Sequence, residues 1–204
     1  MMQILTSMYT YLWFIFFYGM NIGLKKIGVR ESISNTLPSL SHSVLSTLMS
    51  ATTILDYSES NYYSTCSISI GYFLSDTILS VQMLQQSGRK RLLVHHIISL
   101  IGLLIPPNIT SLFFIFTSEC SNIPNQITYI FIKLETDARY IKVLKRIQYY
   151  SFFTGRIILY PVFIMFCPWI DISYWNMQLM YLILSTLYPM SVFWMYKLHK
   201  GYYK

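Results

Sequence analysis

Two adjacent histidines follow a group of cations and begin an apolar run. Arg89, Lys90 and Arg91 precede His95 and His96 by only a few residues. Imidazole gains and loses a proton near neutral pH, so it can act as a general base or a nucleophile. Neighbouring residues on a helix project about 100° apart, so the two rings cannot face the same atom. We therefore expect the two histidines to have different tasks: one would take part in a reaction, and the other would orient a partner group.

Four further ionisable side chains interrupt other apolar runs: His42, Asp76, Glu119 and Arg156. A charge at the centre of a bilayer costs about 2.5–3.5 kcal/mol on insertion scales. These groups should therefore turn inward and form a polar cleft that opens towards the cytosol. We expect Arg156 to pair with Glu119 or Asp76, either as part of the site or as a structural link between helices. The candidate catalytic residues are His42, Asp76, His95, His96 and Glu119.

The composition indicates that a lipid bilayer surrounds these residues. Of the 204 residues, 54% are hydrophobic and only 11% are charged. A soluble domain would carry about 25% charged residues. The net charge of +7 does not indicate nucleic-acid binding, because the cations lie between apolar runs and form no continuous polar face.

The apolar runs predict an all-α integral membrane protein with about seven transmembrane helices. The fourth is shorter than the roughly 20 residues that a perpendicular span needs, so a six-span arrangement that merges or omits it is the alternative. The first run has no preceding cation and is followed by basic residues, so we expect a retained anchor and not a cleaved signal peptide. The predicted spans are Ile4–Ile22, Leu37–Leu55, Ser64–Leu84, Leu92–Ile105, Ile109–Ile132, Ile147–Phe166 and Met177–Tyr196.

The distribution of Lys and Arg predicts the orientation of these spans. Seven spans place fourteen of the fifteen cations on one side, and the remaining one, Arg156, lies within a span. The positive-inside rule then makes the C-terminus cytosolic and the N-terminus lumenal or external.

Several chemistries are disfavoured by the residue inventory. Cys66, Cys120 and Cys167 are odd in number and lie among apolar residues, so neither a disulfide framework nor a metal site is expected. Four histidines are too few for the histidine boxes of a membrane di-iron enzyme. A haem between His42 and one of the histidine pair has no specific signal. We expect no metal and no resident cofactor.

Several short segments, in this order, resemble the TLC-domain family of multi-pass membrane proteins. They are a histidine in the second span (His42), Gly71–Asp76 in the third, His95-His96 in the fourth, Glu119-Cys120-Ser121 ahead of Pro124-Asn125, Arg156 in the sixth, and the closing segment Phe193–Gly201. The resemblance covers residues 32–201. It implies a division into a first transmembrane helix with its basic loop (1–31) and a TLC domain (32–201).

The resemblance also implies a function in lipid chemistry. The family includes ceramide synthases, in which the double histidine is essential for moving a fatty acyl group from acyl-CoA to a sphingoid amine. It also includes proteins linked to lipid composition, membrane fluidity or lipid sensing. This chain departs from the synthases, because residues 97–118 contain no histidine or acid where the synthases have a longer motif. The shared scaffold therefore does not by itself imply ceramide synthesis.

Two hypotheses follow, and both predict bound membrane lipid. In the first, the protein transfers an acyl group from acyl-CoA, its co-substrate, to a sphingoid base or another lipid acceptor. In the second, the same cleft binds lipid without turnover and senses or regulates membrane composition. By resemblance, the location is the endoplasmic reticulum or another endomembrane. The expected substrate-binding residues are Arg89, Lys90, Arg91, Ser121, Asn125 and Arg156.

Overall fold

The computed structural model describes residues 7–82, 89–103, 109–166 and 174–202, and every regular element in these ranges is a helix. The all-α prediction is confirmed for this part of the chain. The elements are α2 (Met8–Lys26), α3 (Glu31–Ser34), α4 (Thr36–Leu55), α5 (Glu59–Gln82), α6 (Arg89–Leu103), α7 (Ile109–Lys133), α8 (Ala138–Phe152), η1 (Phe153–Ile158), α9 (Leu159–Phe166) and α10 (Tyr174–Tyr202).

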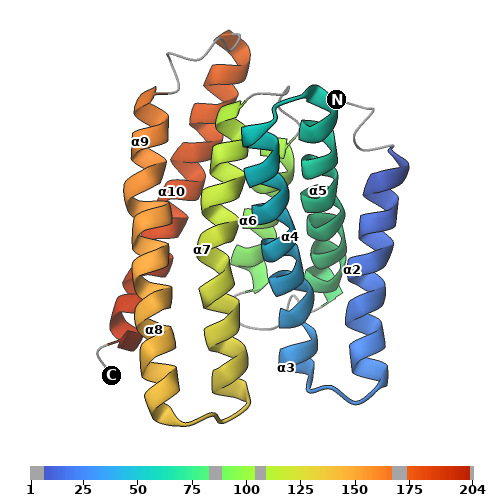
Figure 1. Ribbon diagram of the computed structural model, residues 1–204, viewed down its shortest axis with the longest axis vertical. Coiled ribbons are helices and arrows are strands. Elements are labelled where there is room, and N and C mark those ends of the chain that lie inside the picture. Colours follow the sequence, from blue (N-terminus) through green and yellow to red (C-terminus); the bar gives the residue numbers. More distant parts are fainter. Residues whose placement is uncertain (1–6, 83–88, 104–108, 167–173, 203–204) are drawn as a thin grey trace.

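The long helices run up and down side by side (Figure 1). Elements α8, η1 and α9 follow one another without a break, so they form one long helix. The predicted spans each coincide with a long helix, and the fourth is a separate helix, α6, not a continuation of its neighbours. Arg89, Lys90 and Arg91 begin α6, but their side chains lie outside the described part, as do Cys167 and the parts of the predicted spans at residues 4–6, 83–84 and 104–105.

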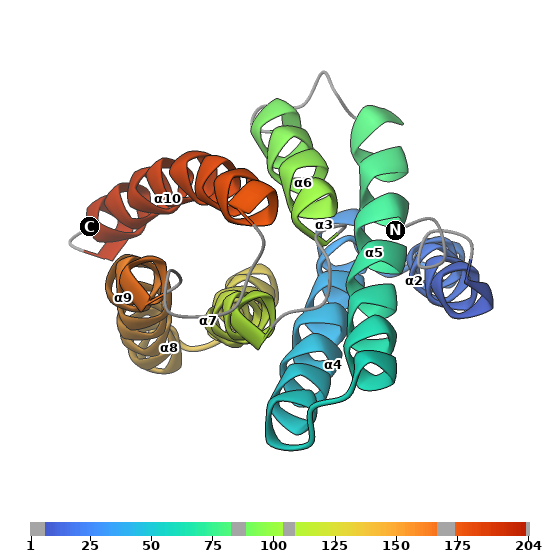
Figure 2. The same ribbon diagram turned by 90° about the horizontal axis from the view of Figure 1, so that it is seen from above.

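Six of the long helices form a closed ring. Each helix packs against the next in the order α4, α5, α6, α10, α8 and α7, and α7 in turn packs against α4. Helix α2 lies outside this ring against α5 (Figure 2). The contact between α4 and α7, which are distant in sequence, closes the ring. The ring therefore surrounds a central space that residues from all six helices can reach.

The crossing of α2 and α5 depends on one glycine. A Cβ atom on Gly71 of α5 would lie 2.6 Å from the Cβ of Trp13 and 2.8 Å from the backbone nitrogen of Phe14. The two backbones therefore approach more closely there than any side chain allows. Close approach through small residues is a usual way for helices to associate in membranes.

The turn after α2 also requires a glycine. Gly28 has a φ of 83°, a left-handed conformation that glycine adopts without a steric penalty. The N–H groups of Gly28 and Val29 donate to the carbonyls of Lys25 and Leu24 at 3.1 and 3.0 Å. This arrangement ends the helix and turns the chain towards α3.

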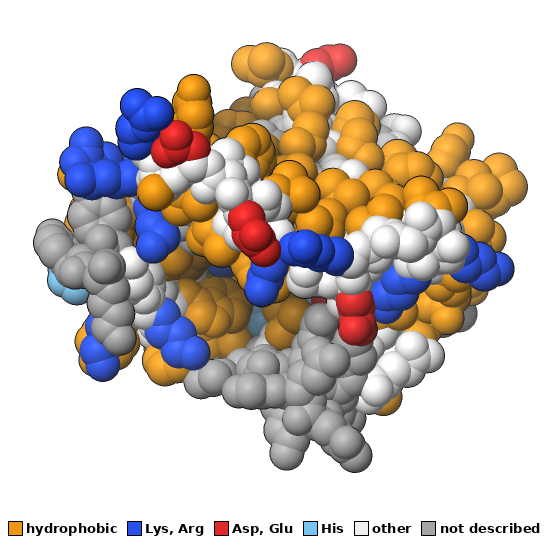
Figure 3. Space-filling model, turned by 90° about the horizontal axis from the view of Figure 1, so that it is seen from below, with side chains coloured by type: hydrophobic (Ala, Val, Ile, Leu, Met, Phe, Trp, Pro, Cys, Tyr) orange, Lys and Arg blue, Asp and Glu red, His pale blue; other side chains and the backbone are white. Residues whose placement is uncertain are grey.

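The turn between α7 and α8 lies at the same end of the bundle. Asp137 caps α8 by accepting from the N–H of Arg139 at 2.8 Å, and this backbone bond and the Arg139 side chain lower the pKa of the Asp137 carboxyl. Arg30, after α2, donates to the carbonyl of Lys133 at 2.8 Å and lies 3.8 Å from Glu135. We call this end, which also contains the last turn of α10, the basic end; Lys and Arg side chains gather on it (Figure 3).

One described helix, Gln178–Gly201 within α10, is long and apolar enough to cross a membrane when judged by length and composition alone. Others, such as α4, carry buried serine and threonine along the face turned into the bundle, and these residues lower the average hydropathy of the helix. The number of membrane crossings and their direction stay predictions.

The predicted orientation can be tested by cysteine labelling. In a variant without the native cysteines, Lys142→Cys on exposed α8 should react with an impermeant maleimide only from the cytosolic side. Glu59→Cys, which is exposed at the start of α5, is the matched position at the opposite end and should react only from the lumenal side. Lumenal labelling at position 142 would overturn the seven-span arrangement.

Candidate functional site

A cavity of about 650 Å³ occupies the centre of the ring. It is lined by residues of α3 and of all the ring helices, and it extends from Glu31 and Lys197 at the basic end down to His42, Glu119 and Arg156. Figure 3 shows the hollow from this end, with basic side chains around it and histidine visible inside. We call it the main cavity. The predicted polar cleft is therefore present, and it opens at the basic end.

The double histidine lies in the wall of the main cavity, and the two rings have different surroundings. His96 is buried, and its Nδ1 lies 3.2 Å from Oδ2 of Asp76 on α5. His95 is more exposed and meets the indole of Trp194 edge to face, with ring centroids 5.1 Å apart. The ring of Phe73 lies 5.1 Å from that of His96. A carboxylate beside an imidazole is the arrangement that orients a general base.

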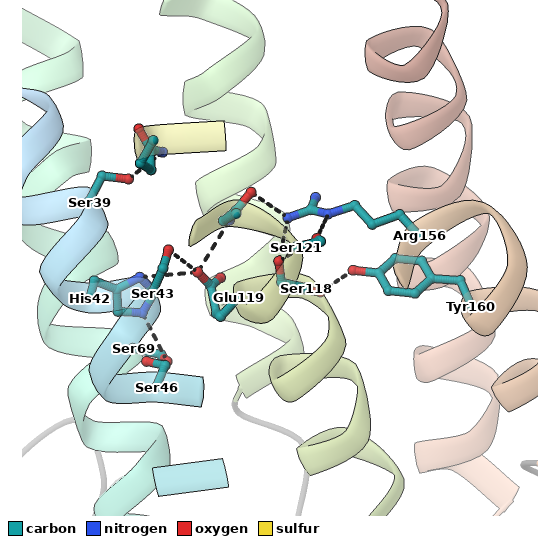
Figure 4. A network of polar contacts seen from close by, with 12 residues as sticks. Ser39, His42, Ser43, Ser46, Ser69, Ser118, Glu119, Ser121, Arg156 and Tyr160 are labelled. Atoms are coloured by element: carbon teal, nitrogen blue, oxygen red, sulfur yellow. Dashed lines mark hydrogen bonds and ion pairs between the residues drawn. The ribbon is translucent and has the colours of Figure 1, made fainter. Parts of the chain in front are cut away.

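A second carboxylate–imidazole pair joins α4 and α7 deeper in the bundle. Nδ1 of His42 lies 3.6 Å from Oε2 of Glu119, and both side chains are buried. The same oxygen accepts from Ser43 at 2.7 Å and from Asn122 at 3.2 Å (Figure 4). The ring of Tyr72 stacks on His42 with centroids 4.1 Å apart. Glu119 is therefore held from both helices at once.

Arg156 does not pair with either carboxylate, contrary to the sequence prediction. Its Nε donates to Oγ of Ser121 at 3.0 Å, and a terminal nitrogen donates to the carbonyl of Ser118 and the side chain of Asn122 at 3.0 and 2.9 Å. Asn122 also donates to Glu119, so the amide stands between the two charges. The guanidinium thus donates to neutral oxygens of α7, and it lies over the ring of Phe152.

A π-helical turn places Arg156 in this position. Proline has no N–H and would clash with the carbonyl four residues before it, so Pro161 disfavours a regular α-helix through the preceding turn. The chain forms η1 there, and the N–H of Leu159 donates to the carbonyl of Thr154, five residues earlier. Gly155 is buried against the carbonyl of Thr117, which would lie 3.1 Å from an added Cβ. Helix η1 therefore packs directly on α7.

Of the remaining predicted binding residues, the structure places one in the wall of the main cavity and one outside it. Asn125 lines the main cavity and accepts from Gln148. Ser121 is buried behind Arg156 and is not among the residues that line either described cavity. Residues at the site that were not among the predicted site residues include Ser43, Ser69, Asn122 and Gln126, together with Tyr72 and Trp194, which lie in the segments that carry the resemblance.

A smaller apolar space of about 100 Å³ adjoins the main cavity between α6, α7 and α10. We call it the inner cavity. Its walls include Gly102, Phe114 and Ile183, and it shares His95, Glu119 and Arg156 with the main cavity. A polar space and an apolar space thus meet at His95, which is the arrangement that a molecule with a polar head and a hydrocarbon chain requires.

A family model described as a TLC domain matches residues 5–200, nearly the whole chain. The chain belongs to the TLC-domain family. The resemblance read from the sequence is thereby confirmed, and the protein is a membrane protein with a lipid-related role. The match begins at residue 5, and the expected division between residues 31 and 32 stays a prediction. Searches among curated proteins and among solved structures found no match.

The TLC domain of this chain therefore offers two acid–imidazole pairs in the wall of the main cavity. His96 and Asp76 lie beside the more exposed His95. His42 and Glu119 are in addition bonded to side chains of α4, α5 and α7. In the described part of the chain, no cluster of three metal-ligating side chains occurs.

Proposed function

We propose that this protein is an acyl-CoA-dependent acyltransferase whose acceptor is the amine or hydroxyl group of a membrane lipid. The observation that carries the proposal is the His96–Asp76 pair, at 3.2 Å, in the wall of a cavity that continues into an apolar space. The polar space suits a headgroup and the reacting atoms, and the inner cavity suits hydrocarbon.

In this mechanism His96 acts as the general base. It takes a proton from the acceptor while the acceptor nitrogen or oxygen attacks the thioester carbonyl. Asp76 orients the ring and stabilises the imidazolium that forms. The carbon–sulfur bond then breaks, a carbon–nitrogen or carbon–oxygen bond has formed, and His96 returns the proton to the leaving thiolate. The products are the acylated lipid and free coenzyme A.

The basic end suits the donor. Acyl-CoA carries several phosphate charges, and Lys197 lines the main cavity close to its opening. Arg89, Lys90 and Arg91 begin α6, the helix that carries the two histidines, and we assign their side chains to the phosphates. With this end in the cytosol, the opening faces the compartment that supplies acyl-CoA. We place the protein in the endoplasmic reticulum or a related endomembrane.

The second candidate is lipid binding without turnover, and it is favoured by the satisfied state of the deeper polar groups. Glu119 accepts a hydrogen bond from Ser43 of α4. Arg156 donates to Ser121 and Asn122 of α7. Such a network can serve to hold the ring of helices together. In this case the main cavity would hold a lipid headgroup, and His95 and His96 would bond it.

Turnover distinguishes the two candidates. Purified protein should be incubated with radiolabelled long-chain acyl-CoA and a panel of acceptors: sphingoid bases, monoacylglycerol, diacylglycerol and lysophospholipids. Acyl transfer predicts a labelled lipid and stoichiometric release of coenzyme A with at least one acceptor. Absence of product across the panel, with lipid that co-purifies with the protein, would contradict the enzyme and support the binding protein.

A further inference from the structure

The pair formed by His42 and Glu119 takes no part in the proposed acyl transfer, yet its geometry is specific. One ring nitrogen of His42, Nδ1, faces the Glu119 carboxylate at 3.6 Å. The other, Nε2, lies 3.1 Å from the hydroxyl of Ser69 on α5. An imidazole with an acid on one nitrogen and a hydroxyl on the other can receive a proton on one side and release it on the other.

The hydroxyl of Ser69 continues a chain of polar contacts away from the main cavity. It lies 3.0 Å from the hydroxyl of Ser46 on α4. Further along, Thr53 and Thr65 form a similar contact between the same two helices at 2.9 Å. Between these contacts lies Ser50, on the face of α4 that carries Ser46 and Thr53. We call these five residues the hydroxyl column.

Two properties separate the hydroxyl column from an ordinary packing seam. Many hydroxyls in this bundle bond a carbonyl of their own helix, as Thr117 and Thr128 do, whereas Ser46 and Ser69 bond across helices. The hydroxyl of Ser50 is fully buried and has no hydrogen-bond partner in the described part of the chain. A packing seam is served as well by alanine or glycine, and a buried hydroxyl without a partner costs about 1–3 kcal/mol. Such a group is a natural site for a bound water molecule.

The column extends from the main cavity towards the end of the bundle opposite its opening. Thr53 lies eleven positions after His42 on α4, which corresponds to about 16 Å at 1.5 Å per residue. Thr65 donates to the carbonyl of Asn61, and the Asn61 side chain donates to the carbonyl of Asp56 in the exposed turn between α4 and α5. The hydroxyl column therefore reaches from the main cavity towards this turn, with Ser50 between its two pairs of bonded hydroxyls.

We propose that the hydroxyl column conducts protons between the main cavity and the turn between α4 and α5, with His42 and Glu119 at its entrance. A proton from water in the cavity binds Glu119 and passes to Nδ1 of His42, and the proton on Nε2 leaves to Ser69. Each following hydroxyl accepts a proton on its oxygen and releases its own, and a water molecule at Ser50 joins the two halves. At the far end Thr65 releases its proton to a water molecule that enters from the exposed turn between α4 and α5. No bond between heavy atoms changes. After the transfer the hydrogen of the His42 ring moves from Nδ1 back to Nε2, which restores the starting tautomer.

Other charged groups near the entrance come from neighbouring helices. Arg156 of η1 reaches Glu119 only through Asn122. The ring of Tyr72 lies between His42 and the His96–Asp76 pair, stacking on His42 and meeting His96 edge to face. The proposal does not depend on acyl transfer, because the column does not include His95, His96 or Asp76.

Proton flux into vesicles tests the proposal. The full-length protein is reconstituted in liposomes that contain a pH-sensitive dye, and a potassium gradient with valinomycin drives proton entry. The unaltered protein should acidify vesicles faster than protein-free liposomes do. Ser46→Ala and Ser69→Ala should each lower this protein-dependent rate by about tenfold, because they keep the size of the residue and remove one link of the column.

The control is Ser185→Ala, an exposed position of α10 whose hydroxyl donates to the carbonyl of Leu182 in its own helix. It should conduct as the unaltered protein does. If Ser69→Ala fails to fold, as judged by its elution profile and helical circular dichroism, Ser50→Ala takes its place, since its hydroxyl has no bond to lose. Flux equal to that of protein-free vesicles would overturn the proposal, and so would undiminished flux in Ser46→Ala together with Ser69→Ala or, where that protein does not fold, Ser50→Ala. An acyl-transfer assay on the same preparations reports separately on the proposed function.

Discussion

Replacement of His96 by alanine should reduce the rate of acyl transfer by about a thousandfold, because a positioned general base contributes about 10²–10⁴-fold. The ring lies 3.2 Å from Asp76, so its loss also leaves a partly buried carboxylate without its imidazole. The Asp76→Asn protein keeps the shape of the side chain but no longer stabilises the imidazolium, and its kcat should fall by at least about a hundredfold. The measurement is initial rate against acyl-CoA concentration, which separates kcat from KM.

Two other histidines serve as comparisons. His95→Ala should raise KM more than it lowers kcat, because His95 borders both cavities without an acidic partner in the described part of the chain. His199→Ala, on the exposed last turn of α10, should leave both constants unchanged. Robust transfer by both the His96→Ala and the His95→Ala proteins would eliminate a histidine mechanism.

Replacement of Gly71 by alanine should destabilise the bundle by about 3 kcal/mol, as overpacking of a close contact does. The added methyl would lie 2.6 Å from the Cβ of Trp13, 2.8 Å from the backbone nitrogen of Phe14 and 3.0 Å from the carbonyl of Thr10. None of these atoms can turn away as the end of a side chain can. Helix α2 must therefore shift along α5, and the hydrophobic contacts of Phe17 with Tyr72 are lost with it.

Gly19 and Gly23 provide matched controls within α2. A Cβ at either position meets nothing within 4 Å, so Gly19→Ala and Gly23→Ala should be neutral or stabilising by about 0.5–1 kcal/mol. Thermal unfolding in one detergent, followed by circular dichroism, compares the three proteins. Equal midpoints for the Gly71 and Gly19 variants would show that α2 does not depend on this crossing.

The convergence of His42, Asp76, His96 and Glu119 on one space could be predicted from the sequence. Each is ionisable within an apolar run, and the cost of placing such groups against lipid turns all of them inward. Which acid lies beside which histidine could not be predicted in the same way. That choice depends on the order of helices around the ring, in particular on α7 packing against α4. A contact between helices that are far apart in the chain leaves no pattern in either stretch of sequence from which it could be predicted.

Arg156 shows a different limit. Charge alone predicts an ion pair, but the structure satisfies the guanidinium with one serine hydroxyl, one carbonyl and one amide of α7. The direction of the side chain depends on η1, and a π-helical turn is not visible in a pattern of hydrophobic residues. Ser43 and Asn122 were missed for a related reason, because small polar residues carry no strong signal. The spacing of hydroxyls at positions 39, 43, 46, 50 and 53, alternating by four and three, is the pattern that could have identified this face of α4.

The π-helical turn gives the long helix α8–η1–α9 one residue that a regular α-helix over the same length would not contain, because such a turn accommodates one residue more than an α-helical turn does. The extra residue is absorbed locally, so the turns on either side keep their register. Deleting one residue between Phe153 and Ile158 should therefore restore regular winding and leave Phe152 and Tyr160, which bonds Ser118, on their present faces. The same deletion within α8, where the winding is regular, would rotate everything on one side by about 100° relative to the other. The loss of a residue should thus be tolerated far better inside the π-helical turn than outside it, and Arg156 is the side chain whose direction depends on that turn.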